Sequence, residues 1–360
     1  MRTLNRLLFA VLVAIFPMAS CLAQWTDAEL EPARAFYAEL DSGGLMVMHR
    51  GQVVVSWGDV TQRYNVASIR KALLNSLYGI AYDRGWINLQ STLSELGIDD
   101  TDPPLTDQEK TATVEDLLHS RSGIFHPSVY EAGWLEYMPE RGLYKPGEYW
   151  VYNNWDFNAL GTIFEQQTGN SIHAAFDAYI AQAIGMQDFR PQDVEYETRR
   201  NLAERMRGNT SDHRLYLFKM STRDLARFGQ LILQRGQWNG EVILSQDWIQ
   251  RTMTAIPTNY PVPQFDTGYG YLWWVESGEH RRVNVPSVKS TVWMATGNRG
   301  HNLYVVPQCD LVIAHTAPTT GGAGALSQIA RRFFGAEGVS DDELGRLYEL
   351  LISSQSDLHC

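Results

Sequence analysis

Apolar runs separated by a short turn predict a β-hairpin near the start of the chain. Residues 44–50 and 53–58 form these runs, and a Gly-Gln pair lies between them. The period then changes, because apolar residues recur at intervals of three and four over 73–81. This spacing predicts an amphipathic helix over about 68–85 that begins at or near a serine.

Four more helices are predicted in the middle of the chain, and strands return in the last third. The helices are expected at 113–118, 155–169, 172–184 and 221–235, the first and the last opened by Thr-x-x-Asp and Ser-x-x-Asp capping patterns. The strands are expected at 269–275, 291–296, 302–306 and 311–315, with a closing helix at about 325–334.

This order of elements predicts an α+β fold. Strands from the two ends of the chain would form one antiparallel sheet, helices would cover its faces, and a mainly helical region would be inserted between them. We therefore expect a sheet domain made of residues 24–78 and 240–360, and a helical domain made of residues 79–239.

Residues 1–23 have the pattern of a secretory signal peptide. Two arginines precede the apolar run 7–16, and small residues lead to Cys21-Leu22-Ala23. The run is too short to span a bilayer, and no later stretch is long enough. Cleavage after Ala23 would give a periplasmic or secreted protein. A lipid anchor on Cys21 is the alternative, which Met18 disfavours as a lipobox opener.

Composition limits the possible partners. With 360 residues, 44% of them hydrophobic and 20% charged, the chain can bury a large core. The net charge of −11 argues against nucleic acid, because phosphate binding needs a concentrated basic surface. The histidines show no metal-ligand spacing and no motif requires a cofactor, so we predict neither a metal ion nor a cofactor.

Cys309 and Cys360 could pair in an oxidising compartment; a buried thiol and a free tail thiol are the alternative.

The segment Ser68-Ile69-Arg70-Lys71 supplies a candidate nucleophile and base. Residues three apart share a helix face, so Ser68 and Lys71 can touch if a helix opens at Ser68. A serine hydroxyl needs a base within hydrogen-bonding reach, and the positive end of a helix favours the developing negative charge. The lysine must be neutral to act as this base, which burial or nearby cations can arrange. The motif is not sufficient alone, because chance supplies roughly one Ser-x-x-Lys in a chain of this length.

A second candidate element is Tyr152-Asn153-Asn154, which follows a Lys-Pro-Gly turn and precedes a predicted helix. A tyrosine beside the Ser-Lys pair can pass a proton toward a leaving group. Asn154 can hold the substrate amide or the lysine through hydrogen bonds. The two motifs in this order favour a catalytic site.

The sequence resembles the serine β-lactamase and penicillin-binding superfamily, most closely its class C-like branch of peptidases, esterases and 6-aminohexanoate-dimer hydrolases. The resemblance covers about residues 44–335, and beyond the two motifs it includes 117–124, 146–147, 221–229, 268–274 and 305–307. It implies a β-lactamase/transpeptidase-like fold, with Ser68 as the acylated nucleophile, Lys71 as its base and Tyr152 as a proton shuttle. By the same resemblance the main-chain N–H groups of Ser68 and Asn298 would form the oxyanion hole.

The third motif departs from the family. The Lys-Thr-Gly or His-Thr-Gly of the inner strand is replaced by Ala295-Thr296-Gly297. In the β-lactam and D-alanyl-D-alanine enzymes this cation helps to hold the substrate carboxylate, and charge-assisted hydrogen bonds are about twice as strong as neutral ones. A substrate without that carboxylate is therefore the simpler expectation, and Gly297 would let a substrate backbone lie close to the strand. The candidates to replace the cation are Arg299, His301 and Lys289.

Six aromatic residues near the motifs are candidates for an apolar acyl pocket, with core packing as the alternative for each. They are Trp134, Trp150, Trp155, Tyr271, Trp273 and Trp274.

The sequence thus predicts an exported serine hydrolase that acts on carboxylic esters or small amides through a Ser68 acyl-enzyme. The expected partner is a small-molecule substrate. A β-lactamase or D-alanyl-D-alanine carboxypeptidase is the first alternative, which Ala295 disfavours. A non-catalytic protein of the same fold that binds cell-wall peptide or another partner is the second.

Overall fold

The computed structural model describes most of the chain after residue 24. The described residues are 25–101, 103–128, 138–193, 196–197, 211–258, 267–278, 281–318, 338–355, 358 and 360. The signal peptide predicted at 1–23, the candidate pocket residue Trp134 and the helix predicted at 325–334 lie outside these residues and stay predictions.

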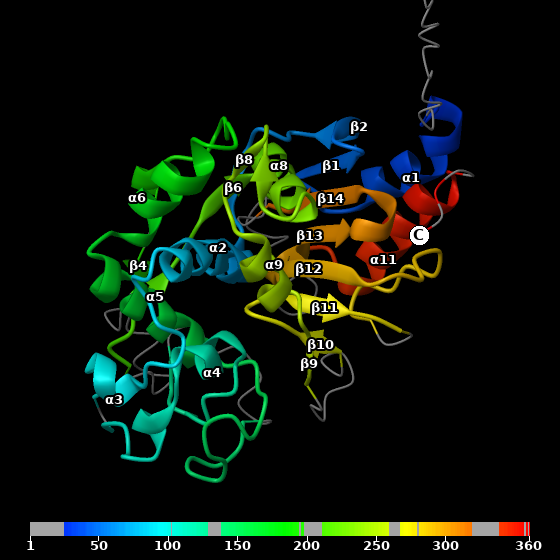
Figure 1. Ribbon diagram of the computed structural model, residues 1–360. Coiled ribbons are helices and arrows are strands. Elements are labelled where there is room, and N and C mark those ends of the chain that lie inside the picture. Colours follow the sequence, from blue (N-terminus) through cyan, green and yellow to red (C-terminus); the bar gives the residue numbers. More distant parts are fainter. Residues whose placement is uncertain are drawn as a thin grey trace, which may run out of the picture.

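An eight-stranded antiparallel sheet organises the described chain, in the order β2-β1-β14-β13-β12-β11-β10-β9 (Figure 1). Its strands are β1 (Gly44–His49), β2 (Gln52–Gly58), β9 (Ile256–Pro257), β10 (Gly268–Tyr269), β11 (Trp274–Glu276), β12 (Val292–Gly297), β13 (His301–Val306) and β14 (Leu311–Thr316). The two ends of the chain meet where β1 pairs with β14. The predicted α+β fold is therefore confirmed.

Helices cover both faces of the sheet. The longer ones are α1 (Asp27–Glu39), α2 (Arg70–Asp83), α5 (Asn154–Thr168), α8 (Thr222–Leu233) and α11 (Asp341–Ser353). The shorter ones are α3 (Leu93–Leu96), α4 (Val114–Leu118), α6 (Ile172–Phe176) with the π-turn Asp177–Ala181, and α9 (Gln246–Thr252). Helix α8 packs on β14, β1 and β13, whereas α1 and α11 contact each other on the opposite face (Figure 1).

The alternation of side chains along the strands separates two cores. In β1, Met46 and Met48 join the core that contains α2 and α8, whereas Leu45 and Val47 join the core that contains α1 and α11. Successive side chains of a strand point to opposite faces, so a fully buried strand is apolar throughout. How the chain divides into the two predicted domains stays a prediction.

Short two-stranded pairs complete the structure. They are β3 (Arg63–Asn65) with β6 (Lys219–Ser221), β4 (Tyr196–Glu197) with β5 (Leu215–Tyr216), and β7 (Gln237–Trp238) with β8 (Glu241–Val242). Strand β3 precedes the turn that leads into α2, and β6 runs directly into α8. The pair β3–β6 therefore ties the start of the candidate catalytic helix to a helix that packs on the sheet.

The strand predicted at 269–275 is wrong, because this run forms two short strands. Tyr269 of β10 pairs with Trp274 of β11, and between them the N–H of Gly270 donates to the carbonyl of Trp273 at 2.8 Å. Leu272 has a φ of 63° within this turn. A continuous apolar run predicts one strand, but here its middle residues are buried in a turn. The helices α1 and α11 were not predicted.

A disulfide joins Cys309 to Cys360. The carbonyl oxygen of Cys360 accepts hydrogen bonds from the N–H groups of Lys289 and Ser290, at 3.0 and 2.8 Å. Of the two alternatives for these cysteines, the structure has the paired form, and it fastens the end of the chain beside the turn between β13 and β14.

Candidate active site

Ser68 lies in a 3-10 turn, Ala67–Ile69, directly before α2. Ala67 adopts a φ of 47°, and its N–H donates to the Asn65 side-chain oxygen at 3.0 Å. A left-handed conformation is unfavourable for alanine, so this contact holds a strained turn. The turn places the half-buried Ser68 at the N-terminus of α2, where the helix dipole favours negative charge.

Lys71 connects the two other candidate catalytic residues. Its Nζ lies 2.9 Å from Ser68 Oγ and 2.5 Å from the Tyr152 hydroxyl oxygen. The side chain is buried, with the residue 2% exposed, and Nζ lies 4.4 Å from the centre of the Phe157 ring. The structure thus brings Ser68, Lys71 and Tyr152 together. Phe157, which lies beside Lys71, is a residue that the sequence patterns did not indicate.

Aromatic rings surround Tyr152. Its ring stacks on Trp274, with centroids 5.8 Å apart and an interplanar angle of 17°, and meets Phe157 edge-on at 5.0 Å. Desolvation raises the pKa of Tyr152; its hydrogen bond with Ser68 and the positive charges of Arg282 and Arg70 act in the opposite direction. The protonated phenol is therefore the stable form at neutral pH, as a proton donor requires.

Tyr152 is positioned by the segment that follows α4. The hydroxyl of Ser120 donates to the carbonyl of Val151 at 2.7 Å and accepts from the N–H of Asn153 at 3.2 Å. The Asn153 amide donates to the carbonyl of Ile124 at 2.5 Å, and its oxygen caps α5. Asn153 is thus structural. Asn154, the candidate substrate-binding residue, begins α5 and is 7% exposed.

Arg70, the neighbour of Lys71 in the sequence, is a buried cation. Its guanidinium donates to the side-chain oxygen of Asn158 at 2.8 Å and lies 4.3 Å from the centre of the Tyr216 ring. Both of these groups are uncharged partners, so they solvate the guanidinium without cancelling its charge. The residue contributes positive potential to the site and was not predicted as part of it.

The third motif lies beside the turn that carries Ser68. Ala295 is buried, Thr296 is half-buried, and Asn298 is exposed in the turn after β12. A Cβ placed on Gly297 would lie 2.3 Å from the carbonyl oxygen of Val66. Glycine is therefore required here by the close approach of the Ser68 turn, a reason different from the expected approach of a substrate.

None of the expected replacements provides an obvious cation next to Ala295. His301 is buried, and this burial lowers its pKa to about 3, so the ring is uncharged at neutral pH. Lys289 is exposed, and Arg299 is half-buried in the turn after β12. The interior near Ala295 is apolar, because this residue belongs to the same core as Val66 and Ile69.

The chain is similar to known proteins in both sequence and fold. The sequence pattern described as Beta-lactamase matches residues 33–333. This chain belongs to the Beta-lactamase family. It is accordingly a serine hydrolase, and the predicted resemblance is confirmed. An uncharacterized protein of Alkalihalophilus pseudofirmus is 22% identical over an alignment of 317 positions, which covers 81% of this chain and 88% of that protein.

Solved structures similar to this Beta-lactamase family member share its fold. A putative 6-aminohexanoate-dimer hydrolase from Bacillus anthracis has a TM-score of 0.59 at 20% identity, over 84% of this chain and 80% of that one. A putative β-lactamase from Bacteroides dorei has 0.63 at 15% identity, over 90% and 98%. A D-stereospecific amidohydrolase from Streptomyces has 0.56 at 17% identity, over 86% and 99%. At these low sequence identities, the similarity shows a shared fold and nothing more specific.

The candidate pocket aromatics are core residues in this family member. Those described are at most 3% exposed: Trp150, Trp155, Tyr271, Trp273 and Trp274. Of these, Trp274 touches the candidate catalytic residues, through its stack on Tyr152. Packing was the alternative stated for each of them, and it applies to the five that are described.

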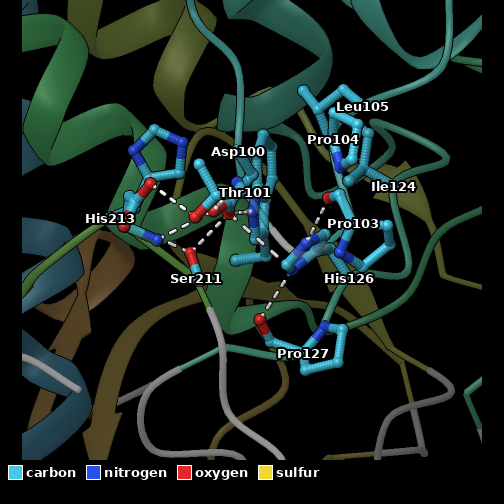
Figure 2. A network of polar contacts seen from close by, with 12 residues as sticks. Asp100, Thr101, Pro103, Pro104, Leu105, Ile124, His126, Pro127, Ser211 and His213 are labelled. Carbon is cyan, nitrogen blue, oxygen red and sulfur yellow. Dashed lines mark hydrogen bonds and ion pairs between the residues drawn. The ribbon is translucent and has the colours of Figure 1, made fainter.

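A buried polar network supports the helix that begins at Asn154. Asp100 accepts hydrogen bonds from Trp155 Nε1 at 2.7 Å and from the hydroxyl of Ser211 at 2.6 Å, and His126 Nδ1 lies 3.7 Å from it (Figure 2). Burial would raise the pKa of Asp100, but these hydrogen bonds outweigh it and hold the pKa below its usual value. The ionised carboxylate thus joins α5 to two distant loops.

The described residues contain no group of three or more His, Cys, Asp or Glu side chains arranged to hold a metal ion. Among the same residues, no helix combines the length and the apolar character needed to cross a membrane.

Proposed function

We propose that this chain is an exported serine hydrolase that cleaves carboxylic esters or small amides through an acyl-enzyme on Ser68. The observation that supports this most directly is the position of Lys71 Nζ, 2.9 Å from Ser68 Oγ and 2.5 Å from the Tyr152 hydroxyl oxygen. Both distances are within the range over which protons transfer between side chains.

In the proposed acylation, Ser68 Oγ attacks the substrate carbonyl carbon while its proton passes to the Lys71–Tyr152 pair. The negative oxygen of the tetrahedral intermediate is stabilised by the N–H groups of Ser68 and Asn298. The carbon–oxygen or carbon–nitrogen bond then breaks, and Tyr152 donates a proton to the leaving alcohol or amine. Water next attacks the acyl-enzyme and gives a proton to the same pair. The bond between the acyl carbon and Ser68 Oγ then breaks, the pair returns the proton to Ser68 Oγ, and the acid is released.

The proposed substrate lacks a carboxylate next to the reacting carbonyl. Ala295 provides a methyl group where many family members have a cation, and an apolar site offers a carboxylate no compensation for its lost hydration. Asn154 and Thr296 then supply neutral hydrogen bonds to the substrate, beside Gly297. The names of two relatives of similar fold, a 6-aminohexanoate-dimer hydrolase and an amidohydrolase, are consistent with an amide.

Export to the periplasm or the medium is part of the proposal. It rests on the signal-peptide pattern of residues 1–23, and the Cys309–Cys360 disulfide is consistent with it because disulfides persist in oxidising compartments. N-terminal sequencing of the protein recovered from cells tests this. A chain that begins at Gln24 supports export as a soluble protein, and a blocked, lipidated Cys21 indicates an anchor instead.

The decisive experiment compares a short-chain nitrophenyl ester with a chromogenic cephalosporin, each with the wild-type protein and with Ser68→Ala. We expect ester turnover that the variant loses, and no cephalosporin turnover. The exposed Ser56 of β2 offers a matched control, because Ser56→Ala removes the same atom from the edge strand of the sheet, with β1, β14 and β13 between it and β12. Full activity in Ser68→Ala would contradict the proposal, and cephalosporin turnover would favour a β-lactamase.

A further inference from the structure

Arg282 and Tyr152 lie against the same indole ring. Trp274 stacks on Tyr152 with centroids 5.8 Å apart, and the Arg282 guanidinium lies 4.9 Å from the centre of the Trp274 ring. Trp274 is 2% exposed, so the ring has little freedom to move away from either neighbour. A positive charge is thereby held near the candidate proton donor.

An ion pair with a residue of α11 fixes the Arg282 side chain. Its Nη2 and Nε lie 3.0 and 3.3 Å from Oδ2 of Asp341, the first residue of α11. The Arg282 side chain is 15% exposed and that of Asp341 33%. A half-exposed carboxylate is partly screened by water, so it orients the guanidinium without fully cancelling its field.

A buried carboxyl group also faces Arg282. The main-chain N–H of Arg282 donates to Oε1 of Glu276 at 3.4 Å, and desolvation raises the pKa of Glu276 to about 7. Near neutral pH this carboxyl is therefore protonated for much of the time. The field that Arg282 exerts on the site remains positive.

We propose that Arg282 is a positioning residue, which holds Trp274 against Tyr152 and, through its charge, makes the Tyr152 hydroxyl a better proton donor to the leaving group. The inference rests on the proposed function, because it assumes that Tyr152 protonates the leaving group.

The proposal predicts a dependence on the leaving group. A good leaving group departs as an anion and gains little from a proton donor, whereas a poor one needs the proton in the transition state. Loss of the charge of Arg282 should therefore slow the cleavage of poor leaving groups more than that of good ones. A general loosening of the site would slow both by the same factor.

The experiment measures kcat/KM for 4-nitrophenyl acetate and phenyl acetate, which share an acyl group and differ in the leaving group. For Arg282→Gln we expect a loss of about threefold with the first ester and about thirtyfold with the second, because general acid catalysis contributes roughly 10²–10⁴-fold in full. Arg282→Lys, which keeps the charge, should recover most of the loss with phenyl acetate.

Two controls separate charge from folding. The neighbouring Arg281 donates to the carbonyl oxygens of Gly278 and Ser290, at 3.1 and 2.7 Å, so Arg281→Gln should leave the ratio of the two esters unchanged. Asp341→Asn keeps the charge of Arg282 and removes the negative charge that opposes it, so this variant should not reproduce the selective loss with phenyl acetate. Melting temperatures of all variants are measured alongside.

Equal losses with both esters in Arg282→Gln would overturn the inference, whatever the melting temperature. Failure of Arg282→Lys to recover phenyl acetate cleavage would overturn the role of the charge. If the wild-type protein cleaves neither ester, or if Ser68→Ala retains full activity, the proposed function itself is contradicted. Failure of the proposed function is therefore distinguished from failure of the inference, which depends only on the ratio of kcat/KM for the two esters.

Discussion

The Lys71 Nζ atom lies 4.2 Å from the centre of the Tyr152 ring as well as 2.5 Å from its hydroxyl oxygen. The Lys71 amino group therefore lies close to both the ring and the hydroxyl of the same side chain. The two residues are 81 positions apart, and the contact depends on the Ser120 and Asn153 hydrogen bonds that fix the segment before α5. A lysine and a phenol held in this way can exchange a proton without a conformational change.

Replacement of Tyr152 by phenylalanine tests this arrangement. The ring remains on Trp274, but the hydroxyl that meets Lys71 is lost. We expect kcat/KM for phenyl acetate to fall by about 10²- to 10⁴-fold, the usual contribution of a general acid. Tyr149→Phe is the control, because Tyr149 is a half-buried neighbour that stacks on Tyr144. A loss of less than tenfold in Tyr152→Phe would argue against the proton-shuttle role.

Replacement of Asp100 by asparagine should destabilise the protein. Asp100 is 3% exposed and accepts hydrogen bonds from Trp155, Ser211 and the N–H of Asp212 (Figure 2). An asparagine would turn an amide donor toward some of these donors, so we expect a loss of about 3 kcal/mol in the free energy of unfolding. Urea unfolding followed by tryptophan fluorescence measures it.

The neighbouring Asp99 is a matched control for Asp100→Asn. Its side chain is 44% exposed and pairs with Lys110 at the surface, where an ion pair contributes only about 0–1 kcal/mol. Asp99→Asn should therefore change the free energy of unfolding by less than about 1 kcal/mol. Equal effects of the two variants would mean that the buried network does not stabilise the fold.

Local patterns in the sequence predict the elements that hold the candidate site. The hairpin β1–β2 follows from two apolar runs around a short turn, although its turn residues are Arg50 and Gly51 and not the predicted Gly-Gln pair. The Thr113 and Ser221 caps follow from their spacing to an acidic residue. Ser68 and Lys71 share a face because they are three residues apart on a helical segment. These features depend on residues that are close together in the chain, so the sequence alone can predict them.

The features that sequence reasoning missed depend on distant contacts. Trp274 meets Tyr152, and Arg282 meets Asp341, only because the sheet and α11 bring remote segments together. The requirement for glycine at 297 likewise comes from the carbonyl of Val66 on another element. No pattern of spacing within the chain encodes such contacts.

The Cys309–Cys360 disulfide should stabilise the fold. It closes a segment of 51 residues, and the loss of chain entropy in the unfolded state then corresponds to about 4 kcal/mol. Double replacement by serine should lower the free energy of unfolding by about 3–4 kcal/mol, measured in urea. Dithiothreitol should lower the melting temperature of the wild-type protein and leave the double variant unchanged. If it affects neither, the bond does not contribute to stability.

The buried acid Glu276 should make stability depend on pH. Burial raises its pKa from 4.5 to about 7, so the folded state keeps a proton that the unfolded state has lost between these values. The contribution of Glu276 to the free energy of unfolding should therefore fall as the pH rises from about 4.5 to about 7, because this carboxyl group is increasingly ionised in the unfolded state. Four buried histidines act in the opposite sense, because burial lowers their pKa to about 3 or 4: His119, His173, His301 and His315.

Because these effects oppose one another, the test compares Glu276→Gln with the wild-type protein at each pH. Glutamine does not ionise, so the variant should gain about 2–3 kcal/mol relative to the wild type between pH 4.5 and 7.5. Urea unfolding at pH 4.5, 6 and 7.5 measures this difference. Glu241→Gln is the control, since Glu241 is exposed and should show no such trend. A difference that is the same at all three pH values would mean that burial does not raise the pKa of Glu276 in the folded protein.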